Sequence, residues 1–191
     1  WYWDESDNRS NYRYGVFGKC KNLKTVTFEE GTTKISRGLF GYCTGIENII
    51  IPDTVTAIED YAFYRCFGLE EIKLSANLET IGLQSFLECT SLKRVSIPNA
   101  VTSIGEQAFA YCVNLAEAKL SKSLTTMGGQ AFGWCESLTE IEIPKSLSIT
   151  NNSWYWDESD NRSNYRYGVF GRCKNLKTVT FEEGTTKIAR G

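Results

Sequence analysis

Six cysteines recur at one fixed interval along this chain of 191 residues. The interval is 23 residues, and the six positions are Cys20, Cys43, Cys66, Cys89, Cys112 and Cys135. Cys173 follows after 38 residues, which is 15 more than the period. A constant period of roughly 20–50 residues is typical of a solenoid, in which copies of one short unit stack on each other. We therefore expect a single repeat array over residues 1–191 instead of separate globular domains.

Apolar residues keep the same period around each cysteine. Phe stands three positions before every Cys, and Leu or Ile stands three positions after it. Further apolar residues six and eight positions after Cys alternate with polar ones, as in Ile72-Lys73-Leu74. This period of two predicts a short strand with one buried face in every repeat. A second apolar pair follows, such as Val101 and Ile104, and one unit can bury these residues only against its neighbours.

The regular spacing of the cysteines argues against disulfides. Equivalent residues of stacked repeats lie about 4.8 Å apart with parallel side chains, whereas a disulfide needs Cβ atoms about 3.8 Å apart and a twisted geometry. We expect a ladder of buried, reduced thiols that behave as small apolar residues, and neither a metal cluster nor a cofactor.

Composition excludes several classes of function. The 21 basic and 23 acidic residues are not clustered by sign, so we expect no nucleic-acid partner. Apolar runs are short, and we expect no insertion into a membrane. Histidine is absent, which removes the usual general base of a catalytic triad. We therefore expect no enzyme and no catalytic residue.

The stretch 97–115 contains the pattern Ile-Gly-x-x-Ala-Phe-x-x-Cys-x-x-Leu. It resembles the BspA-like leucine-rich repeats of bacterial and protozoan surface proteins, and the likeness covers essentially the whole chain. The resemblance implies a leucine-rich repeat solenoid of the β/α or mainly β class, right-handed, with a parallel concave sheet of about seven short strands. Its convex side would be irregular or short-stranded. The resemblance also implies a cell-surface or extracellular location and a role in adhesion.

An aromatic insertion lies in one long repeat, at 148–167, and part of it is duplicated at 1–14. Residues 1–38 and 154–191 differ at only two positions, so we expect the chain to be a fragment of a longer array. Exposed aromatic rings can stack on sugars or anchor a protein interface, but they can also cover their own repeat. The candidate binding residues here are Trp154, Tyr155, Trp156, Tyr165 and Tyr167.

The outward positions of the concave sheet are the second candidate surface, and they carry charges of both signs. This mixture suits a protein partner better than a polyanion, and it also suits a merely solvated face. The candidate residues are Glu71, Lys73, Arg94, Glu117, Lys119 and Glu140.

These two surfaces support three hypotheses about function. The first is a recognition scaffold that binds macromolecules of a host or a neighbouring cell. The alternatives are carbohydrate binding by the insertion and a passive stalk. Because neither end of the sequence resembles a polar cap, we also expect end-to-end self-association.

Overall fold

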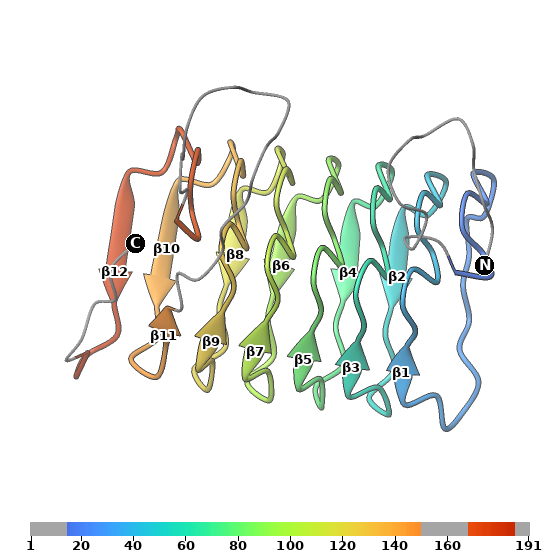
Figure 1. Cartoon of the computed structure of the whole chain (residues 1–191), viewed down its shortest axis with the longest axis horizontal. Helices are drawn as coiled ribbons and strands as arrows, with labels where there is room; N and C mark the ends of the chain where they lie inside the picture. The colour runs from blue at the N-terminus through green and yellow to red at the C-terminus, as the bar shows by residue number, and fades with distance from the viewer. Residues whose placement is uncertain (1–14, 150–167, 186–191) are drawn as a thin grey trace.

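A computed structural model of the chain describes residues 15–149 and 168–185 (Figure 1). These residues form a solenoid with two rows of short parallel strands. The even-numbered strands form the upper row in Figure 1 and follow the cysteines; they are β2 (Asn48–Ile50), β4 (Glu71–Lys73), β6 (Arg94–Ser96), β8 (Glu117–Lys119), β10 (Glu140–Ile143) and β12 (Thr178–Phe181). The odd-numbered strands form the lower row; they are β1 (Lys34–Ile35), β3 (Ala57–Ile58), β5 (Thr80–Ile81), β7 (Ser103–Ile104), β9 (Thr126–Met127) and β11 (Ser148–Ile149).

The odd strands make one continuous six-stranded parallel sheet in the order β1-β3-β5-β7-β9-β11. Neighbouring strands are offset by one repeat, so that Ile58 lies opposite Ile81 and Ile81 opposite Ile104. This is the side on which short strands were predicted, and the two-residue strands confirm that prediction. Hydrogen bonding is nevertheless more continuous here than on the even side.

The even strands pair only in twos, as β2–β4, β6–β8 and β10–β12. The parallel strand after each Cys is confirmed, but the described residues contain six such strands, and residues 23–28 of the first described repeat form none. Each pair begins with a strand that a proline follows, namely Pro52, Pro98 or Pro144. Proline has no N–H, so these strands lack a backbone donor just beyond their ends. The strand pairs and the prolines therefore both recur at every second repeat.

The core is built from columns of equivalent residues, and the Phe column is uniform. The Phe rings before each Cys stack face to face, with centroids 5.1 Å apart for Phe63–Phe86 and 5.0 Å for Phe86–Phe109. Stacked aromatic rings at this distance attract each other beyond the apolar area that they bury. The solenoid therefore repeats one favourable contact along its whole axis.

The cysteines confirm the predicted ladder of reduced thiols. All seven are free, and the five from Cys43 to Cys135 are fully buried. Each of these thiols donates a hydrogen bond to the backbone oxygen of the Phe 26 residues earlier, as from Cys112 to Phe86, with 3.3 Å between Sγ and O. Cys20 differs from this prediction, because it belongs to the first described repeat and is exposed.

Candidate binding surface

The six charged residues predicted to face outward do so, and all six are exposed on the even strands. We call the outward side chains of β2 to β12 the even-strand face. Glu142 of β10 joins them there. Strand register places Arg94 beside Glu117, and Glu140 beside Thr178. The alternation of inward and outward residues along each strand therefore brings the predicted residues onto one surface.

Seven charged side chains on this face form no ion pair with any described residue. They are Glu71, Lys73, Arg94, Glu117, Lys119, Glu140 and Glu142. Elsewhere, charged residues of neighbouring repeats do pair: Lys34 lies 2.9 Å from Glu59, and Arg65 lies 2.8 Å from Glu88. The charges of the even-strand face thus remain available to another molecule.

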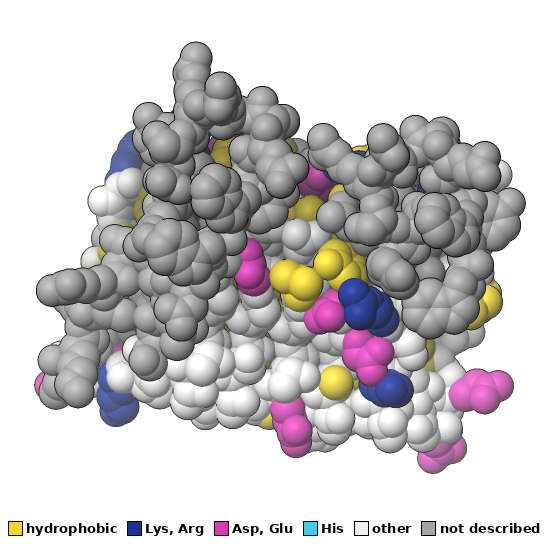
Figure 2. Space-filling model, in the orientation of Figure 1, with side chains coloured by type: hydrophobic (Ala, Val, Ile, Leu, Met, Phe, Trp, Pro, Cys, Tyr) yellow, Lys and Arg dark blue, Asp and Glu magenta, His cyan; other side chains and the backbone are white. Residues whose placement is uncertain are grey.

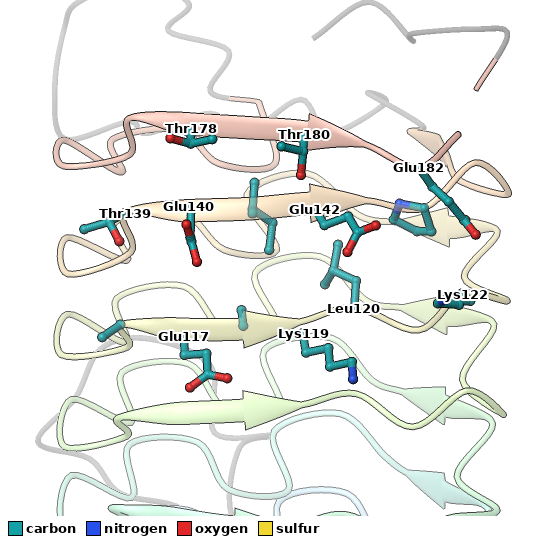
Figure 3. Close-up of a pocket in the computed structure, with 14 residues that line it drawn as sticks. Glu117, Lys119, Leu120, Lys122, Thr139, Glu140, Glu142, Thr178, Thr180 and Glu182 are labelled. Atoms are coloured by element: carbon teal, nitrogen blue, oxygen red, sulfur yellow. The ribbon is translucent and has the colours of Figure 1, made fainter. Parts of the chain in front are cut away.

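A hollow of about 630 Å³ opens at the C-terminal end of the even-strand face (Figure 3). Its walls are charged and polar side chains from three strands: Glu117 and Lys119 on β8, Glu140 and Glu142 on β10, and Thr178 and Thr180 on β12. Ala118, Leu120 and Ile141 also line it, and all three are buried members of the core. The hollow therefore combines a polar rim with an apolar floor.

The hollow exists because small residues interrupt two columns of the repeat. Ala116 stands where the preceding repeat has Lys93 and the one before it has Glu70. Ala118 stands where the other six repeats carry Val or Ile. Shorter side chains at both positions leave space beside β10. This signal was present in the sequence, but without the register of the strands it did not indicate a hollow.

At the N-terminal end of the even-strand face, Ile50 adds an exposed apolar side chain. Its side chain is 66% exposed on β2, beside Lys73 of β4. A single exposed apolar side chain is common on protein surfaces, so Ile50 by itself marks no interface and only adds one apolar group to the charged face.

The five aromatic candidates of the insertion, Trp154, Tyr155, Trp156, Tyr165 and Tyr167, lie outside the described residues. Within the predicted range 148–167, the described part is Ser148–Ile149, which forms β11 and pairs with β9. Register continues on the far side of the long repeat, where Ile141 of β10 lies opposite Val179 of β12.

Sequence reasoning missed a row of side chains at the turn before each cysteine. These residues all adopt a left-handed backbone, with φ between 57° and 65°: Lys19, Tyr42, Arg65, Glu88, Tyr111, Trp134 and Arg172. Tyr111 and Trp134 stack with ring centroids 4.5 Å apart. The signal was an aromatic or charged residue immediately before every Cys.

Arg65 organises the N-terminal half of this row. Its guanidinium donates hydrogen bonds to the Tyr42 hydroxyl at 2.6 Å and to the Glu88 carboxylate at 2.8 Å. It also lies 5.4 Å from the Tyr42 ring and 5.2 Å from the Tyr64 ring. These contacts engage both terminal nitrogens of the guanidinium within the protein, while its buried Nε has no hydrogen-bond partner among the described residues, and we regard the cluster as structural.

The outward positions of the odd strands carry mostly uncharged side chains. Figure 2 shows charged side chains gathered over the N-terminal repeats of this side and mostly white atoms across its middle. Outward residues there include Thr80, Ser103 and Thr126. Near the N-terminal end, hydrogen bonds from the Lys34 ammonium and the Arg37 amide lower the pKa of Glu59. This side offers fewer charges for recognition than the even-strand face.

Two classes of site find no support in the described parts of the chain. No group of three or more His, Cys, Asp and Glu residues is placed there to hold a metal ion. No helix in residues 15–149 or 168–185 is long and apolar enough to cross a bilayer.

Comparison with known protein families agrees with the repeat architecture of the structure. The family described as "BspA type Leucine rich repeat region" matches residues 7–115 in six copies. This chain belongs to that family. A search of curated proteins gives no significant match.

Three solved structures are similar in fold. The leucine-rich repeat protein TpLRR of T. pallidum is 24% identical with a TM-score of 0.71, over 85% of this chain and 70% of that one. A leucine-rich repeat protein from Bacteroides ovatus is 23% identical with a TM-score of 0.63, over 88% and 51%. The pneumococcal vaccine antigen PcpA is 22% identical with a TM-score of 0.61, over 80% and 36%. The chain thus spans only part of each, and the likeness shows the fold.

Proposed function

We propose that this chain is a non-catalytic recognition scaffold that binds a protein partner through the even-strand face. The observation that carries the proposal is the set of seven exposed charges without an ion pair among the described residues. A repeat array builds an extended surface from such positions. Complementary charges on a partner would set its orientation and raise the rate of association.

The pattern of charge favours a protein over a polyanion. Glu71 and Arg94 lie on neighbouring repeats, as do Lys73 and the uncharged Ser96, so no basic stripe runs along the face. Nucleic acids and acidic polysaccharides need such a stripe. A protein surface can match both signs together with the apolar Ile50.

We also propose that the scaffold works at the cell surface or in secreted form, as an adhesive protein. Membership in the BspA-type family supports this location, and one structural neighbour is a vaccine antigen. Labelling of intact cells of the source organism with an antibody against the chain tests it. Signal only after the cells are permeabilised would contradict the proposed location.

A binding screen tests the role of the even-strand face. The chain is immobilised and offered extracellular-matrix proteins and glycans, and bound protein is quantified. The double variant Lys73→Glu with Arg94→Glu should weaken protein binding by about tenfold or more, because it reverses two charges of the interface. The control Lys21→Glu with Lys24→Glu makes the same change in net charge outside the seven-residue set. Equal losses from both variants would overturn the proposed site.

Carbohydrate binding by the aromatic insertion is the second candidate, and the two tryptophans in 154–156 favour it. Binding to a glycan array by the whole chain, lost in Trp154→Ala with Trp156→Ala, would establish it. A screen without any bound protein or glycan would favour the passive stalk.

End-to-end self-association is a separate proposal. Val179 and Phe181 occupy positions that face the core in other repeats, and they are 45% and 43% exposed. Covering them against another chain would remove apolar surface from water. Light scattering that shows only monomer at high protein concentration would overturn this proposal.

A further inference from the structure

We propose that the hollow between β8, β10 and β12 receives a basic side chain, arginine or lysine, from an extended segment of the protein partner. The inference rests on the proposed function and specifies the chemistry of that partner. It concerns one end of the even-strand face, where both shape and charge differ from the rest.

The charge of the hollow is negative. Four carboxylates line it, from Glu117, Glu140, Glu142 and Glu182, against the two ammonium groups of Lys119 and Lys122. Glu182 is the one carboxylate of the four with an ion pair in the described residues, at 3.9 Å from Lys145. The other three have no ionic partner there. A cation in the hollow would relieve the repulsion between these neighbouring carboxylates.

The floor of the hollow suits the aliphatic part of a long basic side chain. Ala118, Leu120 and Ile141 are at most 9% exposed, and they present apolar surface below the carboxylates. Lysine and arginine bury their methylene groups on such a surface while the charged head stays at the polar rim. A guanidinium can also bond two carboxylate oxygens side by side.

The size of the hollow points to an organic cation. Its volume of about 630 Å³ is in the range of small-molecule sites, roughly 300–1,000 Å³. The carboxylates of Glu117, Glu140 and Glu142 stand apart along the two strands in Figure 3 and do not converge on one point. A divalent metal needs oxygen ligands about 2.0–2.6 Å from one centre. A side chain with several donors fits the observed spread better.

The interrupted columns of the repeat provide a variant that should fill the hollow and keep the fold. Lysine stands at the position of Ala116 in three other repeats, at Lys24, Lys93 and Lys177. Ala116→Lys therefore introduces a residue that the repeat already accepts. Its side chain would occupy the hollow and place a positive charge beside Glu117.

The test uses the whole chain and two short peptides that differ only in the charge of two side chains. The first is acetyl-Gly-Arg-Gly-Arg-Gly-amide, and the second carries neutral citrulline in place of arginine. Backbone amide signals are followed by NMR during titration. We expect saturable shifts in 116–120, 139–143 and 178–182 with the arginine peptide and none with the citrulline peptide. Affinity should fall at least tenfold in Ala116→Lys and in Glu140→Gln with Glu142→Gln, and should be unchanged in Glu79→Gln, which alters an exposed residue outside the even-strand face.

Three results would overturn the inference: shifts that spread over all acidic residues without saturation, equal binding of both peptides, or undiminished binding by Ala116→Lys. The last variant also separates this inference from the proposed function. A protein partner that is lost with Lys73→Glu and Arg94→Glu, but is retained at full strength by Ala116→Lys, would leave the scaffold role standing and refute the basic side chain in the hollow.

Discussion

The thiol of Cys89 donates a hydrogen bond to the backbone oxygen of Phe63, with 3.2 Å between Sγ and O. The same contact joins Cys66 to Phe40 at 3.1 Å and Cys135 to Phe109 at 3.3 Å. A thiol is small enough for the tight core and still satisfies a buried oxygen of the repeat before it. Cysteine therefore ties each repeat to the preceding one without a covalent bond.

Replacement of Cys89 tests this contact. Cys89→Ala should lower the free energy of unfolding by about 1–2 kcal/mol, because both the hydrogen bond and the packing of the sulfur are lost. Cys20→Ala is the control and should change it by less than about 0.5 kcal/mol, since that thiol is exposed. Urea denaturation followed by circular dichroism measures both. Similar losses in the two variants would show that the buried thiol contributes nothing specific.

The buried thiols should make the protein sensitive to alkali. Burial raises the pKa of the Cys112 thiol to about 12, whereas an unfolded chain has about 8.5. The folded state thus favours the neutral thiol, so this stabilisation is complete below about pH 8.5 and declines as the pH rises toward 12. Between pH 8 and pH 10, the wild type should lose about 1–2 kcal/mol more than Cys112→Ala. If the free energy of unfolding falls equally with pH in the two proteins, the expectation is contradicted.

Gly105 is required by the close approach of two repeats. A Cβ atom there would lie 2.5 Å from the backbone nitrogen of Leu83 and 2.6 Å from the carbonyl carbon of Gly82. Gly105→Ala should therefore lower the free energy of unfolding by about 2–3 kcal/mol, the usual effect of overpacking. At Gly31 the backbone is left-handed but no atom lies within 4 Å, so Gly31→Ala should lose only about 1–2 kcal/mol from local strain. A larger loss at Gly31, measured by thermal unfolding, would contradict this reason.

A ladder of side-chain amides should stabilise the turn region. Gln107 is buried, donates to the Gln130 carbonyl oxygen at 2.9 Å and accepts a hydrogen bond from the Gln84 amide. Gln107→Ala leaves groups on both neighbours without this partner and should lower the free energy of unfolding by about 2–3 kcal/mol. Asn99→Ala removes an exposed hydrogen bond that the Lys122 backbone N–H donates to the Asn99 side-chain oxygen, and it should lower the free energy of unfolding by less than about 1 kcal/mol. Equal losses would show that burial of the ladder is unimportant.

Charges of the even-strand face should be dispensable for folding. Arg94→Gln should change the free energy of unfolding by less than about 0.5 kcal/mol, because Arg94 makes no ion pair in the described residues. Arg65→Gln should lower the free energy of unfolding by about 1–2 kcal/mol, since it removes the hydrogen bonds to Tyr42 and Glu88. A large loss in Arg94→Gln would mean that this face is held together by its charges and would weaken the proposed binding role.

Much of this architecture was predictable because a repeat turns local sequence into global structure. The spacing of Phe86 and Cys89 recurs in every unit, so residues one period apart had to stack. Alternation along Glu71-Ile72-Lys73 was enough to place two charged side chains outside and an apolar one near the core. These inferences required only the residue types and the length of the repeat.

The sequence alone determined the solenoid, its thiol ladder and the outward charges, since all three depend on residues that repeat in phase. Only the tertiary structure decided that the even strands pair in twos, that side chains before the cysteines form a row, and that Ala116 and Ala118 open a hollow beside Glu140. The hollow arises where one repeat departs from the others, whereas the paired strands and the row of side chains recur along the array. Their outcome depends on distances between neighbouring turns, and a one-dimensional pattern does not contain those distances.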